Sequence, residues 1–116
     1  MRHLSRGRKF GRKKGDRVSF RNGLLNNLIL AGRVETTEAR AKEIRPRLEK
    51  LVTIARKNNL SALRLLLRSL PQETAYKLYH EIGPRYLKRP GGYLRIVKTA
   101  SRRKRDAAAK AIIEFV

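Results

Sequence analysis

The sequence predicts an α+β fold in which helices pack on one face of a small three-stranded sheet, in the order α-β-α-α-α-β-β. Apolar residues recur at helical spacing in four segments, and three short segments are rich in β-branched residues. No internal repeat is visible in the sequence. The mixture of helical and β-rich segments is typical of a single domain in which helices and a sheet form two packed layers. With 116 residues, 41% of them hydrophobic, the chain is long enough to bury one core.

The first helix is expected from residue 16 to about residue 31. Asp16 is a candidate N-cap, and Gly32 suits the left-handed residue that ends many helices. The apolar face of this helix combines two neighbouring rows, Phe20, Leu24 and Leu28 in one and Val18, Leu25 and Ile29 in the other. Residues 33–36 then predict a short strand.

The second helix is expected to begin after Thr37, which is a candidate N-cap, and to reach about residue 57. Pro46 should kink or restart it, because a proline inside a helix costs about 3 kcal/mol. Beyond the proline, helical spacing indicates a buried face made of Leu48, Leu51, Val52 and Ala55.

Two further helices are expected before the sheet is completed. The third helix follows Asn58-Asn59, carries a buried stripe of leucines and ends at Pro71. The stripe consists of Leu63, Leu66, Leu67 and Leu70. Apolar residues at 75, 78, 79 and 82 predict a fourth helix, which Gly83-Pro84 should close.

A C-terminal hairpin is predicted from two β-rich segments, residues 93–98 and 110–116. The loop between them, residues 100–108, contains the basic run Arg102-Arg103-Lys104-Arg105.

Positive charge is concentrated in two segments of the chain. The 30 Lys and Arg against 9 Asp and Glu give a formal net charge of +21. Residues 1–17 hold eight basic residues and one acid, and residues 83–105 hold nine basic residues and no acid. A surface built only for solubility mixes both signs. We therefore expect a basic N-terminal arm, residues 1–15, on a single domain, residues 16–116, that together bind a polyanion.

Residue content argues against several other classes of protein. Without cysteine there is no disulfide framework, Cys-ligated zinc site or Cys nucleophile, and no apolar run reaches the roughly 20 residues of a membrane span. His3 and His80 accompany no triad, HExxH or P-loop motif, and His80 is expected on a helix surface. The basic start lacks the apolar region of a secretory signal. We expect an intracellular protein with no catalytic residues, cofactor, metal site, membrane partner or small-molecule substrate.

The N-terminal segment predicts an arm that lies along phosphates, with a disordered solubilising tail or a localisation signal as the alternatives. Gly7, Gly11 and Gly15 recur every four residues among Lys and Arg. Arginine suits phosphate because its planar guanidinium donates two hydrogen bonds at once. The candidate RNA-binding residues of the arm and the first helix are Arg2, His3, Arg6, Arg8, Lys9, Arg12, Lys13, Lys14, Arg17 and Arg21.

The segment from residue 82 to residue 95 alternates basic residues with tyrosines. Tyr86 and Tyr93 could stack on unpaired bases while neighbouring cations hold phosphates, or both rings could pack into the core. The candidate RNA-binding residues of this segment and of the hairpin are Arg85, Lys88, Arg89, Tyr93, Arg95, Arg102, Arg103, Lys104 and Arg105.

Several separated motifs follow one another along almost the whole chain. They are Met1-Arg2-His3, Phe20-Arg21-Asn22, VETTEARAKEIR at 34–45, LVTIAR at 51–56, EIGPRY at 81–86, RPGGYLRIVK at 89–98 and AIIEFV at 111–116. In this order they resemble the bacterial large-subunit ribosomal protein seventeen family. The resemblance implies the same α+β fold in a structural component of the large ribosomal subunit that binds large-subunit ribosomal RNA in the cytoplasm. It also implies neighbouring large-subunit ribosomal proteins on the solvent side, near the exit-tunnel end.

Composition alone leaves two other classes open. A DNA-compacting protein would need symmetric dimers and a preference for duplex, and neither an extended dimer arm nor an apolar wedge is evident in the sequence. A membrane-active protein would need basic and apolar faces on one helix, whereas the most basic segments here are the least helical.

Overall fold

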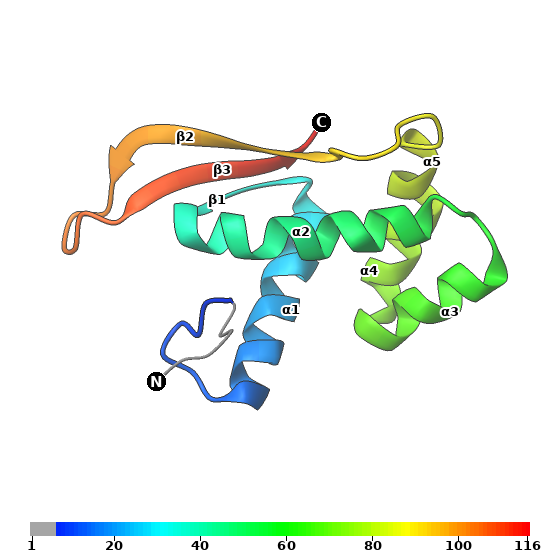
Figure 1. The fold of residues 1–116 in the computed structure, drawn as a ribbon, viewed down its shortest axis with the longest axis horizontal. Helices are drawn as coiled ribbons and strands as arrows, with labels where there is room; N and C mark the ends of the chain where they lie inside the picture. The colour runs from blue at the N-terminus through cyan, green and yellow to red at the C-terminus, as the bar shows by residue number, and fades with distance from the viewer. Residues whose placement is uncertain (1–6) are drawn as a thin grey trace.

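The computed structural model describes residues 7–116 and shows a helical layer packed against one face of a three-stranded sheet (Figure 1). The elements are α1 (Lys14–Ala31), β1 (Arg33–Thr37), α2 (Glu38–Ala55), α3 (Leu60–Ser69), α4 (Gln72–Lys77), a π-helical turn (Leu78–Ile82), α5 (Gly83–Arg85), β2 (Leu94–Arg102) and β3 (Ala109–Phe115). The α+β prediction is confirmed. Three predicted arm residues, Arg2, His3 and Arg6, lie outside the described residues.

The sheet is antiparallel, with β3 between β1 and β2. Ile113 of β3 lies opposite Val34 on one side and Ile96 on the other, and all three side chains pack in or against the core. The neighbouring residue of β3, Glu114, points to the opposite face because side chains alternate along a strand. One face of the sheet therefore rests on the helices while the other carries charge.

The predicted hairpin is confirmed as the pair of β2 and β3. The strands are longer than the sequence indicates, because β2 continues to Arg102 after a register irregularity between Lys98 and Arg102. The loop therefore shrinks from the expected residues 100–108 to residues 103–108, and Arg102 ends a strand instead of lying in the loop.

Helix α1 begins two residues earlier than expected. Its N-cap is Lys13, so Asp16 lies in the first turn, where its negative charge still favours the positive end of the helix dipole. The C-terminal prediction is confirmed, since Gly32 has φ +79° and its N–H bonds to the carbonyl of Leu28. The predicted apolar face is too wide, because Val18 borders an open hollow between α1 and α2 and is 43% exposed.

Helix α2 runs through Pro46 as one helix, so the expected restart does not occur. Pro46 has no N–H, so the carbonyl of Lys42 one turn earlier loses its usual hydrogen-bond donor. Both residues are exposed, and water can donate to this carbonyl instead. Thr37 caps the helix as predicted, accepting a hydrogen bond of 3.3 Å from the backbone N–H of Arg40. Leu48, Val52 and Ala55 are fully buried, which confirms the face predicted after the proline.

Helix α3 is capped by Asn59, whose side-chain oxygen accepts from the N–H of Ala62 at 2.8 Å. Leu66 and Leu70 are buried as predicted. Leu67 is 37% exposed, so its inclusion in the buried stripe was wrong: α3 is covered by α2 and α4 on one side only. Ala62, which the predicted stripe did not include, is buried.

The helical stretch that starts at Gln72 does not close at Gly83-Pro84, as expected, but reaches Arg85 through the π-helical turn. Gly83 has helical backbone angles, and a Cβ at this position would stand 2.9 Å from the carbonyl oxygen of Ala55. Pro84 falls in the first turn of α5, where its missing N–H costs little. The glycine serves a close approach to α2 rather than a helix stop.

Candidate nucleic-acid interface

The described part of the basic arm, residues 7–13, folds back on α1. Gly7, Phe10 and Gly11 all have positive φ, so the chain turns repeatedly before the helix begins. The Phe10 ring meets Phe20 edge-on with 5.3 Å between centroids, and the Arg12 guanidinium lies 3.9 Å from the centroid of the Phe20 ring. Both contacts are of the favourable aromatic and cation–π kinds. The base of the arm is thus packed against the domain.

Three arginines surround a buried carboxylate beside this turn. Glu43 of α2 is 8% exposed, and its oxygens lie 3.6 Å from Arg8, 3.8 Å from Arg21 and 3.9 Å from Arg47. These arginines come from the arm, α1 and α2. Because an isolated buried charge is costly, the three cations together compensate one carboxylate and hold the arm to both helices.

The other basic residues of the arm and of the start of α1 face solvent more freely. Lys9, Lys13 and Lys14 are exposed and have no ion pair with any carboxylate of residues 7–116. Arg17 is half-buried and donates to the carbonyl of Arg12 at 3.2 Å. Among the described residues 7–17, these three lysines therefore remain available as point charges.

The four cations of the hairpin tip, residues 102–105, are of two kinds, those bonded within the loop and those that are not. Arg103 forms a two-pronged ion pair with Asp106, and this hydrogen bond, more than any other cause, holds the pKa of Asp106 below its ordinary value. Arg102 donates to the carbonyl of Ala107 at 3.0 Å. Lys104 and Arg105 are exposed and have no such pair within the described chain. The loop is thus shaped by two arginines and presents two other cations.

The two tyrosines of the segment 82–95 are core residues. Tyr93 is 1% exposed and its hydroxyl accepts from Arg56 at 3.3 Å, while the Tyr86 hydroxyl donates to the carbonyl of Val116 at 2.7 Å. Their rings lie 5.2 Å apart, and burial raises the pKa of Tyr86 against the opposing effect of the neighbouring Arg85 and Arg89. The candidate role of Tyr93 as a stacking platform is therefore wrong, because its ring has no face open to a base.

Around these buried rings, the cations of the segment stay exposed. Arg85, Lys88 and Arg89 have no carboxylate within ion-pair distance in residues 7–116. The backbone here is held by Arg56, which donates to the carbonyl of Leu87 at 2.9 Å. Arg95, in contrast, bonds to Glu114 at 2.7 Å on the outer face of the sheet, and Arg33 lies 3.5 Å from the same carboxylate.

The hairpin tip and the loop of residues 85–92 lie at opposite ends of the molecule (Figure 1). Arg8 of the arm lines a shallow hollow with Ala108 and Ala109 of the hairpin, so the arm base and the hairpin are neighbours. We call residues 7–14 and 102–110 the arm–hairpin end, and residues 85–92 the loop end. Strand β2 separates them along the longest extent of 45 Å. The structure therefore unites the arm with the hairpin, although the sequence places the hairpin next to the loop.

Sequence reasoning missed Glu43, Arg40 and Lys110. The only local signal for Glu43 is Arg47 one helical turn later, since Arg8 and Arg21 are distant in sequence. Arg40 and Lys110 lie outside both basic segments and meet only through the pairing of β1 with β3.

Neither a membrane-spanning helix nor a metal centre is found in the part of the chain that the structure describes. No helix in residues 7–116 is both long and apolar enough to cross a bilayer. Nor does that range bring together three or more metal-ligating side chains.

Fold and charge define a small, strongly basic α+β protein, and comparison with known proteins gives its family. The family model described as ribosomal protein L17 matches residues 20–116. The large ribosomal subunit protein bL17 of Thermodesulfovibrio yellowstonii is 46% identical over all of this chain and 87% of its own length. The proteins of the same name from Sulfurihydrogenibium sp. and Thermus thermophilus are 45% and 41% identical over all of this chain and 97% and 99% of their lengths. The chain belongs to the ribosomal protein L17 family.

Proposed function

We propose that this protein is a non-enzymatic structural constituent of the large ribosomal subunit that binds large-subunit ribosomal RNA through both of its basic ends. Its place is then in the cytoplasm, within the ribosome, beside neighbouring large-subunit ribosomal proteins. The basic arm, residues 1–15, and the domain that follows act together, with the arm reaching phosphates that the domain cannot approach.

The observation that supports this proposal most directly is the set of exposed cations without carboxylate partners at both ends. Lys9, Lys13, Lys14, Lys104 and Arg105 supply the arm–hairpin end, and Arg85, Lys88 and Arg89 supply the loop end. Such cations release counterions from RNA phosphates when they bind, and they contact the backbone without reading bases. The burial of Tyr86 and Tyr93 agrees with this mode, since no aromatic platform is left in the loop for stacking.

The test is sedimentation of ribosomal subunits through a sucrose gradient, before and after a high-salt wash. We expect the protein in the large-subunit fraction before the wash and partial release after it. Its absence from that fraction before the wash would overturn the proposal.

A second measurement tests the phosphate contacts. If about ten phosphates are engaged, the logarithm of affinity for ribosomal RNA should fall against the logarithm of salt with a slope of about −7 for single strands, and more steeply for duplex. A slope between about −1 and −2 would contradict contact through both ends. Competition with duplex DNA tests the rival class: a DNA-compacting protein would prefer the duplex.

A further inference from the structure

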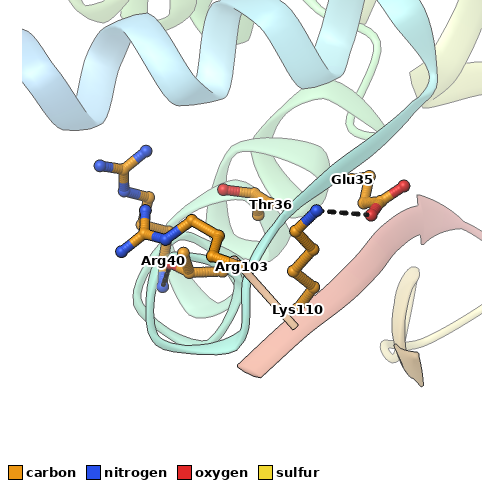
Figure 2. Close-up of a pocket in the computed structure, with 6 residues that line it drawn as sticks. Glu35, Thr36, Arg40, Arg103 and Lys110 are labelled. Carbon is orange, nitrogen blue, oxygen red and sulfur yellow. Dashed lines mark hydrogen bonds and ion pairs between the residues drawn. The ribbon is translucent and has the colours of Figure 1, made fainter. Parts of the chain in front are cut away.

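A cavity of about 440 Å³ opens between the end of β1, the start of α2 and the hairpin (Figure 2). Its lining residues are Glu35, Thr36, Thr37, Arg40, Arg103 and Lys110. Three of these are cations, and they come from three different elements: Arg40 from α2, Arg103 from the hairpin loop and Lys110 from β3. No stretch of sequence collects them, so the tertiary structure creates this concentration of positive charge.

The side chain of Arg40 is held in place without being neutralised. Its guanidinium lies 5.0 Å from the centroid of the Phe20 ring, on which Arg12 also rests. Within residues 7–116 it has no carboxylate inside 4.0 Å. A cation–π contact orients a guanidinium but leaves its full charge and its outward N–H groups available.

The other two cations differ in how far they are paired: Lys110 is paired weakly, and Arg103 is bonded to Asp106 through two of its three nitrogens, Nε and Nη2. Lys110 lies 3.9 Å from Glu35, beyond hydrogen-bond distance, and the Glu35 side chain is half exposed. Arg103 is bonded to Asp106, which does not line the cavity. In the view of Figure 2, the guanidinium groups of Arg40 and Arg103 lie at one end of the cavity and the pair of Lys110 with Glu35 at the other. Like charges brought together in this way repel unless an anion lies between them.

We propose that this cavity binds one phosphodiester group of an RNA backbone, held by the guanidinium groups of Arg40 and Arg103 and by the ammonium of Lys110. The guanidinium of Arg40 can donate to two phosphate oxygens at once, and a lysine adds a point charge. Arg103 adds the donors of Nη1, since its other two nitrogens are bonded to Asp106. The inference rests on the proposed function and adds Arg40 and Lys110 to its contact residues. The cavity lies at the arm–hairpin end, so a backbone that contacts Lys104 and Arg105 can continue into it.

The first test compares two doubly substituted proteins that lose equal charge. Arg40→Gln with Lys110→Gln empties the cavity of two cations, and Arg64→Gln with Arg68→Gln removes two exposed arginines of α3. With a large-subunit ribosomal RNA fragment as the probe, we expect the salt slope of the cavity variant to fall in magnitude by about 1. The α3 variant should keep the wild-type slope. Equal slopes for the two variants would overturn the inference.

Folding is controlled for by thermal unfolding and by a conservative change. Arg40 contacts Phe20, so the double variant can lose stability, whereas Lys110→Arg keeps the charge and should keep the wild-type slope. Lys110→Gln alone should lower the slope without changing the unfolding temperature by more than a few degrees. A lowered slope for Lys110→Arg as well would show that the effect is structural and would overturn the inference.

The second test separates an RNA phosphodiester from free phosphate. A lysine-modifying reagent should label Lys110 more slowly when the RNA fragment is bound, while Lys77 of α4 reacts as before. Inorganic phosphate at the same ionic strength should protect neither lysine. Protection of Lys110 by inorganic phosphate alone would assign the cavity to a free anion and overturn the assignment to RNA. A wild-type protein that does not bind the RNA would contradict the proposed function itself.

Discussion

The arm–hairpin end and the loop end both carry dense positive charge, but they hold it differently. At the arm–hairpin end, Arg8 is held by an ion pair with Glu43 of α2, and Arg103 by an ion pair with Asp106. At the loop end, the cations have no carboxylate partners within the described residues, and buried tyrosines fix the backbone instead. Ion pairs therefore fix two arginines at the arm–hairpin end, beside cations that are unpaired within the described residues. At the loop end, the packing of buried rings fixes the chain that carries the cations.

The difference shows how a protein with a net charge of +21 keeps a defined surface. An ion pair holds the geometry of an arginine but cancels part of its charge, whereas an unpaired cation keeps its charge and loses side-chain entropy on binding. The arm and the hairpin loop lack a core of their own, so they need the ion pairs. The loop end adjoins the core and does not.

The largest effect is expected from Tyr93→Ala, which removes the buried ring beneath the loop end. Loss of a buried aromatic ring costs about 3–5 kcal/mol of unfolding free energy. The measurement is denaturant unfolding, with Val97→Ala on the exposed outer face of the sheet as the control. A small loss of stability together with a large loss of RNA affinity would instead make Tyr93 a stacking residue.

The next effect concerns RNA affinity and compares the ends directly. Replacing Arg85, Lys88 and Arg89 with Gln, or Lys9, Lys13 and Lys14 with Gln, should each reduce the magnitude of the salt slope by about 2. The measurement is RNA binding across a series of salt concentrations, with Arg64→Gln and Arg68→Gln as the control. If only one triple variant changes the slope, the other end does not contact RNA.

A smaller effect is expected from Glu43→Gln, which leaves three arginines around an uncharged amide. We expect a loss of about 1–2 kcal/mol, less than for a fully buried, hydrogen-bonded pair, because the distances of 3.6–3.9 Å are long and Arg8 and Arg47 are partly exposed. Amide hydrogen exchange of residues 7–13 should become faster. Glu81→Gln, at an exposed residue of the π-helical turn, is the matched control. Unchanged exchange in the arm would show that Glu43 does not hold it.

The smallest effect is expected from Asp106→Asn at the hairpin tip. The lowered pKa of Asp106 means that its ionised form is favoured in the folded loop. Its contribution is therefore complete above a pH of about 4, the ordinary value for an aspartate, and is lost as the pH falls through the lowered pKa. The measurement is hydrogen exchange at the N–H of Ala108, which bonds to Asp106 at 3.2 Å. Wild type and variant should differ at neutral pH and converge in acid; a difference that persists in acid would exclude the ion pair as its cause.

The sequence by itself determined the features that depend on neighbouring residues. Thr37 as a cap, Gly32 as a helix end and the strand–loop–strand pattern of the hairpin all follow from local conformational preference, which a few residues decide. The segregation of charge into two segments is likewise a property of the chain and needs no fold.

Only the tertiary structure decided what distant segments do to one another. It placed Tyr93 in the core, let α2 run through Pro46, and made Gly83 a site of close packing instead of a helix end. It also brought Arg8 and Arg21 to Glu43, and Arg40 and Lys110 to Arg103. Such outcomes depend on which surfaces lie together after the chain folds, and residues far apart in sequence carry no local signal of that pairing.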